Sequence, residues 1–357
     1  MNIFFIFLIF ILSTSNICPI PNSLEEEIFT SEELLLNANN LCISNRTHNI
    51  TVHAYFTPWN KLGKNFSVEY SNKFDIISPV WYTAEYKDDS VFITGSEFYD
   101  YKYLDHIHQK NIKIMPRLNF HDNFPSWIKK LNEERFSNKM IQRIVNYFSD
   151  NNFDGITLDI GRYLGQKEYP IILWNLCKNL KYALTKKNMS LIISFPIVNS
   201  EESNLVLIKM MSQFLEVVDI IQVMSYDYTS GNFNSPYFWI QKFLKEAYLS
   251  SINMSKILIG IPLYGYIYQS GKSVEVVKGT DFLKILNNTK NVYDWNLEAK
   301  EGQWKILKKR TVDIDNQIMT YPTIKFVKER IALAKQFQCG ISFWELGQSL
   351  RLILNEI

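Results

Sequence analysis

The chain has 357 residues, and its 38 Lys and Arg residues against 36 Asp and Glu residues give a net charge of +2. This balance argues against nucleic-acid binding through a basic face. Hydrophobic residues make up 46% and charged residues 21%, which excludes a disordered chain and supplies enough apolar material for a sizeable core.

The first residues predict a secretory signal peptide. An apolar run over residues 3–12 ends in Ser13, Thr14 and Ser15, small residues of the kind that signal peptidase accepts. The alternative is an uncleaved anchor, but ten apolar residues fall short of the roughly 20 that span a bilayer, and no later stretch is long enough. We therefore expect a signal peptide over residues 1–15, an N-terminal extension over 16–49, no membrane span, and a secreted protein resident in lysosomes or outside the cell.

Candidate glycosylation sites are consistent with a secretory route. Six Asn-X-Ser/Thr triplets offer glycosylation candidates at Asn45, Asn49, Asn65, Asn188, Asn253 and Asn287.

The even number of cysteines, Cys18, Cys42, Cys177 and Cys339, allows three pairings in an oxidising compartment. Cys177 and Cys339 lie in apolar segments, and we expect them to be buried free thiols. The chain has no zinc-type spacing and its five histidines are scattered, so we expect no metal and no cofactor.

From about Val52 onward, short apolar runs rich in β-branched and aromatic residues alternate with longer amphipathic stretches. This alternation is typical of repeated βα units. The predicted strands cover residues 52–56, 74–81, 112–120, 153–160, 190–197, 218–227, 256–265 and 339–346.

Eight such units predict an α/β protein of the (β/α)₈ barrel class over residues 50–357. The long gap between the seventh and eighth strands predicts a small insertion over about residues 271–321. A doubly wound sheet also fits the alternation, but it usually has fewer strands and often a GxGxxG loop, which this chain lacks. We favour the barrel, whose site would lie at the carboxyl ends of its strands.

Three strand ends carry recognisable motifs. The fourth strand reads DGITLDIG over residues 154–161, the sixth ends in QVMSYD over 222–227, and the eighth ends in FWE over 343–345. In this order they resemble the DGxDxDxE strand, the QxMxYD strand and the tryptophan-bearing last strand of the family 18 glycoside hydrolases, the chitinases and chitinase-like lectins. The likeness runs from about Cys42 to the C-terminus.

The match is partial at the position that matters most. Thr157 stands where the family has its first inner aspartate, and Gly161 stands where it has its catalytic glutamate. The resemblance therefore implies no catalytic residue at Gly161 but a retained groove for chitin-type N-acetylglucosamine oligosaccharides. The expected carbohydrate-binding residues are Trp344, Tyr226, Asp227, Met224, Asp159, Trp59, Trp81, Arg117, Asn119, Asp122 and Glu345.

Two alternatives stay open beside the non-catalytic lectin. One is a weak glycoside hydrolase with a relocated acid at Asp227, Glu345 or Glu168. The other is a protein-interaction scaffold with a vestigial sugar site. Segments 56–60, 78–81 and 344–348 resemble one subfamily of chitinase-like proteins, and that resemblance implies a scavenger-receptor type protein partner.

Overall fold

The computed structural model describes residues 21–26, 29–42, 44–228, 230–269, 272–307 and 317–357. The expected signal peptide and Cys18 lie outside the described residues. Within the described part, no helix is both long and apolar enough to traverse a bilayer.

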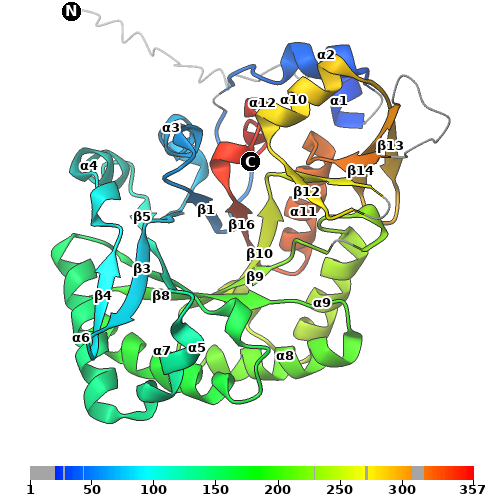
Figure 1. Ribbon diagram of the computed structural model, residues 1–357. Helices are drawn as coiled ribbons and strands as arrows, with labels where there is room; N and C mark the ends of the chain where they lie inside the picture. Colours follow the sequence, from blue (N-terminus) through cyan, green and yellow to red (C-terminus); the bar gives the residue numbers. More distant parts are fainter. Residues whose placement is uncertain (1–20, 27–28, 43, 229, 270–271, 308–316) are drawn as a thin grey trace, which may run out of the picture.

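The predicted (β/α)₈ class is confirmed by a closed ring of parallel strands (Figure 1). β1 pairs with β16 on one side, Val52 opposite Ile341, and with β2 on the other, His53 opposite Ile76. The strands of the ring are β1 (Val52–Phe56), β2 (Ile76–Pro79), β5 (Lys113–Ile114) with β6 (Arg117–Phe120), β7 (Gly155–Asp159), β8 (Ser190–Pro196), β9 (Ile220–Met224), β10 (Ile257–Pro262) and β16 (Gly340–Trp344).

The third strand position is divided in two by Pro116. A proline has no N–H to give to the ladder, so the regular pairing stops between β5 and β6. The ring nevertheless continues through this break, because Asp154 and Thr157 donate their N–H groups to the carbonyls of Ile114 and Pro116, both at 3.0 Å. A hairpin of β3 (Tyr82–Lys87) and β4 (Ser90–Thr94), which sequence analysis did not predict, pairs with β6.

Helices cover the outside of the ring because their apolar faces pack on the strands. They are α3 (Lys61–Glu69), α4 (Tyr101–His108), α5 (Phe124–Trp127), α6 (Glu134–Asp150), α7 (Tyr169–Thr185), α8 (Glu201–Phe214), α9 (Tyr237–Leu249), α11 (Ile324–Gln336) and α12 (Arg351–Leu354). Short 3₁₀ turns are η1 (Ser71–Lys73), η2 (Ser96–Phe98), η3 (Ile128–Asn132), η4 (Gly161–Tyr163), η5 (Ser230–Asn232), η6 (Met254–Lys256) and η7 (Leu346–Gln348).

A second, antiparallel sheet lies between β10 and β16 in the sequence, on the right in Figure 1. It starts at Gly265, earlier than the expected start of the insertion at 271. Its elements are β11 (Gly265–Tyr268), β12 (Glu275–Val277), α10 (Gly279–Asn288), β13 (Lys290–Asn296), β14 (Glu301–Leu307) and β15 (Gln317–Thr320).

The described part of the N-terminal extension forms α1 (Asn22–Glu26) and α2 (Ser31–Asn37), which lie over α10 and α11. Leu24 and Leu34 are buried there. Cys42 is disulfide-bonded, and Cys177 and Cys339 are buried free thiols, as expected. Burial raises the pKa of the Cys339 thiol to about 12, so this thiol stays protonated.

A polar layer crosses the lower part of the barrel interior. The two ring nitrogens of His53 bond to Ser78 Oγ at 2.7 Å and Ser342 Oγ at 2.8 Å, and Ser78 Oγ also bonds to Thr157 Oγ1 at 2.7 Å. All four side chains are buried. Thr157 therefore belongs to the packed interior, and burial lowers the pKa of His53 to about 3.

Because buried His53 stays neutral in the folded protein, we expect the free energy of unfolding to decrease in acid. Folded His53 is neutral, whereas the unfolded chain takes up a proton on it below about pH 6.5, so the free energy of unfolding falls as pH falls from 6.5 towards 3. His53→Asn should remove about 1.4 kcal/mol per pH unit of that dependence between pH 6 and 4, measured by urea unfolding. His121→Asn, at an exposed histidine, is the control. Equal slopes for the His53→Asn variant and the unmodified protein would contradict the prediction.

Candidate functional site

Aromatic and charged side chains from β1, β6, β7, β16 and the turn after β9 meet at the mouth of the barrel. The rings of Tyr55 and Trp344 meet edge to face with centroids 5.0 Å apart. The guanidinium of Arg117 lies 5.8 Å from the centre of the Trp344 ring. Trp344 and Arg117 are both half-buried, so part of each stays accessible from the mouth.

Asp159 is fixed from two sides. Arg117 Nε donates to Asp159 Oδ2 at 2.9 Å, and Arg117 Nη2 bonds to the same oxygen. Ser194 Oγ donates to Asp159 Oδ1 at 2.5 Å and accepts the N–H of Gly161 at 2.8 Å. The carboxylate at the end of β7 is thus a paired anion that orders the mouth.

Gly161 follows β7 and has no side chain to offer the mouth. A Cβ atom placed there would lie 2.4 Å from Met224 Cε and 3.1 Å from Ser194 Oγ. The methyl end of Met224, at the end of β9, therefore fills the space in front of Gly161. Because that end is flexible and Gly161 has no left-handed φ, the backbone itself tolerates a side chain here.

Asp227 stands at the boundary between barrel and insertion. Its backbone has φ of 64°, and its carboxylate accepts the hydroxyls of Tyr264 and Tyr266. Its N–H donates to Asn234 Oδ1 at 3.0 Å. Burial, with Asp227 close by, raises the pKa of the Tyr264 phenol, which is therefore a neutral donor.

A buried ion pair supports this turn from below. Asn234 and Ser235 donate their N–H groups to the carboxylate of Glu301 at 3.0 and 2.6 Å. Arg330 Nη2 lies 3.9 Å from Glu301 Oε1 and donates to the carbonyls of Ser235 and Ala299. Burial raises the pKa of Glu301, and the Arg330 charge opposes that shift. The pair anchors the β14 end of the insertion to the loop after β9.

Tyr226 completes the polar surface between Asp159 and Asp227. Burial raises the pKa of its phenol, and the two carboxylates raise it further. At neutral pH Tyr226 is therefore an uncharged hydroxyl beside two anions. The arrangement as a whole offers aromatic faces, one cation and several hydrogen-bonding groups, which is the chemistry that holds a sugar ring.

Comparisons with known proteins agree with this geometry. Residues 50–349 match the model of the glycosyl hydrolases family 18. The chain belongs to that family. Among solved structures, it resembles a chitinase from Chromobacterium violaceum at 17% identity with a TM-score of 0.71, over 86% of this chain and 98% of that chain.

Two further solved structures share this fold. The C-terminal domain of a putative chitinase from Desulfitobacterium hafniense has 17% identity and a TM-score of 0.70, over 87% of this chain and 99% of that chain. The spore cortex-lytic enzyme SleL from Bacillus cereus has 15% identity and a TM-score of 0.69, over 90% of this chain and 80% of that chain. At such identities the likeness concerns the fold.

The structure places some of the expected sugar-binding residues away from the mouth of this family 18 barrel. Trp81 is only 5% exposed and packs edge to face on Phe56 and Tyr103. Glu345 is buried, accepts from Asn60 Nδ2 and the N–H of Gly347, both at 3.1 Å, and has its pKa raised by burial. Trp81 is therefore held by aromatic packing and Glu345 by buried hydrogen bonds.

The remaining expected residues lie on the rim. Trp59 is 72% exposed in the turn before α3. Asn119 is half-buried and accepts from Thr83 Oγ1 at 2.7 Å. Asp122 is exposed, with an ion pair of 3.5 Å to Arg162. Of these rim residues, Asn119 is on β6, the strand that carries Arg117.

Sequence analysis missed Tyr55, Ser194, Tyr264 and Tyr266. Tyr55 and Ser194 lie within strands that were predicted, and the register of the ring places them near Trp344 and Asp159. Tyr264 and Tyr266 follow β10, and their contact with Asp227 depends on where the insertion docks. Alternation along β8 could have marked Ser194 as an inward polar residue.

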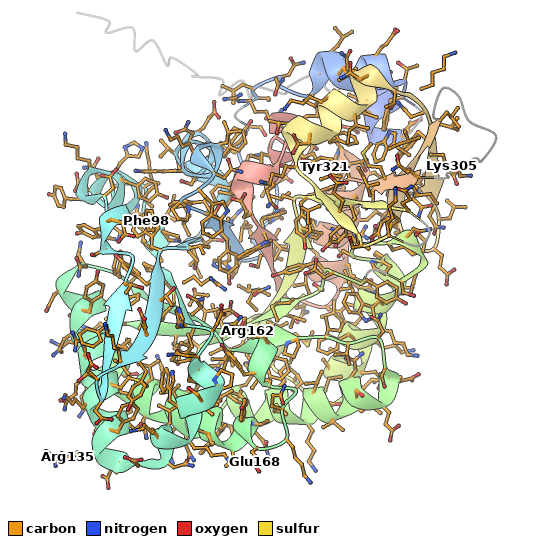
Figure 2. The ribbon with its side chains drawn as sticks, viewed as in Figure 1. Phe98, Arg135, Arg162, Glu168, Lys305 and Tyr321 are labelled. Atoms are coloured by element: carbon orange, nitrogen blue, oxygen red, sulfur yellow. The ribbon has the colours of Figure 1, made fainter. Side chains whose placement is uncertain are left out.

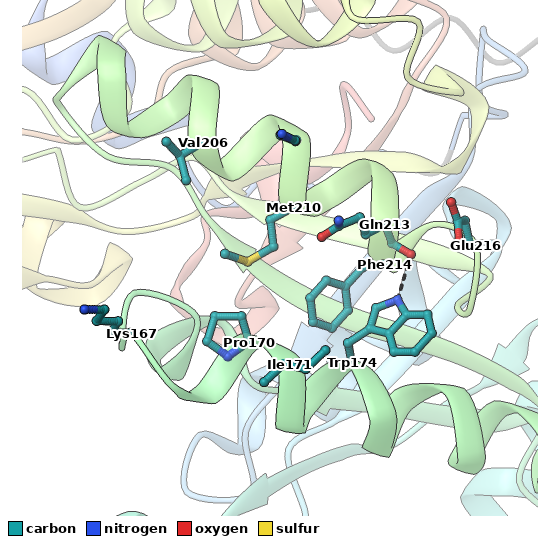
Figure 3. A pocket seen from close by; sticks show the side chains of 10 residues that line it. Lys167, Pro170, Ile171, Trp174, Val206, Met210, Gln213, Phe214 and Glu216 are labelled. Carbon is teal, nitrogen blue, oxygen red and sulfur yellow. Dashed lines mark hydrogen bonds between the residues drawn. The ribbon is translucent and has the colours of Figure 1, made fainter.

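The outer wall carries a separate groove of about 590 Å³ between α7 and α8. Figure 3 shows Trp174 donating its indole N–H to the carbonyl of Gln213, at 3.0 Å, beside Phe214. This tryptophan packs between helices, outside the barrel mouth. Among the residues that the structure describes, no group of three His, Cys, Asp or Glu side chains could hold a metal ion.

The side chains of the six glycosylation candidates are all exposed. Asn188 and Asn253 lie in turns, Asn45 and Asn49 in the segment before β1, Asn287 near the end of α10 and Asn65 within α3. Accessibility is therefore compatible with modification at each of them.

Ser194→Ala should destabilise the protein by about 1–3 kcal/mol, because it leaves the buried N–H of Gly161 and one oxygen of Asp159 without their partner. Urea unfolding measures this change. Ser190→Ala, at the half-buried start of the same strand, is the matched control. A Ser194→Ala cost no larger than that of the control would show that the contact adds nothing to stability.

Proposed function

We propose that this protein is a non-catalytic chitinase-like lectin that binds chitin-type N-acetylglucosamine oligosaccharides in the mouth of its barrel. The observation that carries the proposal is Gly161, whose missing side chain is replaced by the methyl end of Met224. By resemblance, this is the position of the family's catalytic acid. Family membership and chitinase neighbours support the ligand class.

Hydrolysis in this family is substrate-assisted, so the protein must supply an acid that protonates the leaving oxygen. Asp159 is the last residue of β7, two residues before Gly161 in the turn η4, and its carboxylate is held by Arg117 and Ser194. Because both of its carboxylate oxygens are already bonded, Asp159 is poorly suited to take over the role of the acid. Loss of a general acid forfeits about 10²- to 10⁴-fold in rate.

The competing hypothesis is a weak hydrolase with a relocated acid. The contacts of the three candidate acids argue against it, because each carboxylate already has a partner. Asp227 accepts two tyrosine hydroxyls, and Glu345 is buried under α3 and η7. Glu168 forms an ion pair of 2.9 Å with Lys129 and lies at the edge of the molecule in Figure 2. Each carboxylate already serves another contact.

The sugar would lie on the aromatic surface of the mouth. Trp344, which packs on the buried ring of Tyr55, would provide the floor, with Tyr226 beside it. Arg117, Asn119 and Asp227 would offer polar contacts. Sugar affinity rests on such ring faces and on fixed polar groups, neither of which needs the missing acid.

Residence and partner are part of the same proposal. The resemblance of three strand ends to chitinase domain-containing protein 1, the stabilin-interacting chitinase-like protein, supports a secreted protein in lysosomes or outside the cell. It also supports a protein partner of the scavenger-receptor type. If no oligosaccharide binds, the hypothesis of a protein-interaction scaffold with a vestigial sugar site replaces that of the lectin.

Chito-oligosaccharides of increasing length should bind with increasing affinity and remain intact, as measured by calorimetry and by product analysis of the same mixtures. Trp344→Ala should weaken binding by about tenfold or more, because it removes the aromatic floor. Trp174→Ala, on the outer wall, should leave affinity unchanged. Absence of binding, or cleavage by the unmodified protein, would overturn the lectin.

Restoring the acid should restore trace hydrolysis. Gly161→Glu combined with Met224→Ala supplies the carboxyl and removes the methyl that a Cβ would meet at 2.4 Å. This double variant should release products at least about 10²-fold faster than Gly161→Gln with Met224→Ala, which has the same shape and no acid. Equal rates for the two double variants would contradict the assignment of Gly161.

A further inference from the structure

A groove on the rim of the barrel lies between α3 and the first turn of α4, and one of its lining residues is Asn65. The groove encloses about 740 Å³. Lys64 of α3 forms an ion pair with Asp100, the cap of α4, and Ser67 Oγ bonds to Tyr103 Oη at 2.8 Å. These contacts fix the two helices beside each other, and Figure 2 shows Phe98 next to α4.

The lining of this groove combines exposed aromatic rings with polar side chains. Phe98 is 40% exposed and Tyr101 is 69% exposed. Asn60, Lys61 and Lys102 contribute polar groups along the same groove. Aromatic faces flanked by hydrogen-bond donors suit the apolar face and the acetamido group of an N-acetylhexosamine.

Asn65 opens the triplet Asn65-Phe66-Ser67, and its side chain is exposed. Every N-linked glycan begins with an N-acetylglucosamine bonded to the asparagine amide. A glycan at Asn65 would therefore begin among the groove's own lining residues. Tethering makes the contact intramolecular and gives it a high effective concentration.

The packing of α3 also dictates when this glycan could be attached. The Ser67 hydroxyl, which the modification requires in accessible form, is fully buried and bonded to Tyr103 and to the carbonyl of Lys64. Attachment must therefore precede the docking of α3. This order is that of glycosylation on a chain still being translocated.

We propose that Asn65 carries an N-linked glycan whose first N-acetylglucosamine lies in this groove against Phe98 and Tyr101. The glycan is the groove's occupant and covers aromatic surface that the fold leaves exposed. This inference rests on the secretory route of the chain, and it is independent of sugar binding in the barrel mouth.

The test uses the full chain secreted from a eukaryotic cell line. Native protein is treated with peptide-N-glycosidase, and glycan release at each asparagine is followed over time by glycopeptide mass spectrometry. Release at Asn65 should be about tenfold slower than at Asn188, an exposed turn residue with φ of 57°. After denaturation the two rates should converge.

Two variants distinguish binding of the Asn65 glycan in the groove from general steric hindrance of the glycosidase. Phe98→Ala with Tyr101→Ala should accelerate native release at Asn65 to within about twofold of Asn188, and because both rings are exposed the core stays intact. Tyr182→Ala, at an exposed tyrosine of α7, should change nothing. An unmodified Asn65, equal native rates, or slow release that survives the double substitution would each overturn the proposal. If no asparagine is modified, the secretory route fails with it.

Discussion

The parallel pairing of β1 with β16 closes the barrel, and the geometry of the mouth depends on this closure. Val52 and Ile341 are far apart in the sequence, yet their register sets Tyr55 edge to face against Trp344. Closure also removes the open strand edges. Since all strands of the ring run the same way, their last residues converge on one rim, and the polar layer of His53, Ser78 and Ser342 fixes the strands below it.

The insertion acts on the mouth through one continuous series of contacts. Arg330 faces Glu301, Glu301 accepts the N–H of Asn234, and Asn234 accepts the N–H of Asp227. Tyr264, just before β11, and Tyr266, within β11, then donate their hydroxyls to the Asp227 carboxylate. Removing one partner of a buried ion pair leaves an uncompensated charge, at a cost of about 3–5 kcal/mol. The position of Asp227 is therefore coupled to the docking of the whole second sheet.

The order of the strands could be predicted from the sequence, because the alternation of strands and helices is a local pattern. Alternation of βα units indicated the barrel, and the strand containing Asp159 lies where it was expected. Trp81 and Glu345 show the limit: a motif places a residue at a strand end, but only packing decides whether its side chain turns into the mouth or into the wall. The tyrosines around Asp227 depend on the docking of two units, which no local pattern encodes.

The pairing of Gly161 with Met224 explains how the mouth keeps its shape around a glycine. An empty space of side-chain size in a packed interior costs free energy that grows with its volume. The flexible thioether of Met224 fills that space from β9 without a polar group, while Ser194 takes up the N–H of Gly161. The half-buried ring of Trp344, which packs on the buried ring of Tyr55, is thus held on an intact frame. The frame of the mouth therefore does not depend on a side chain at position 161.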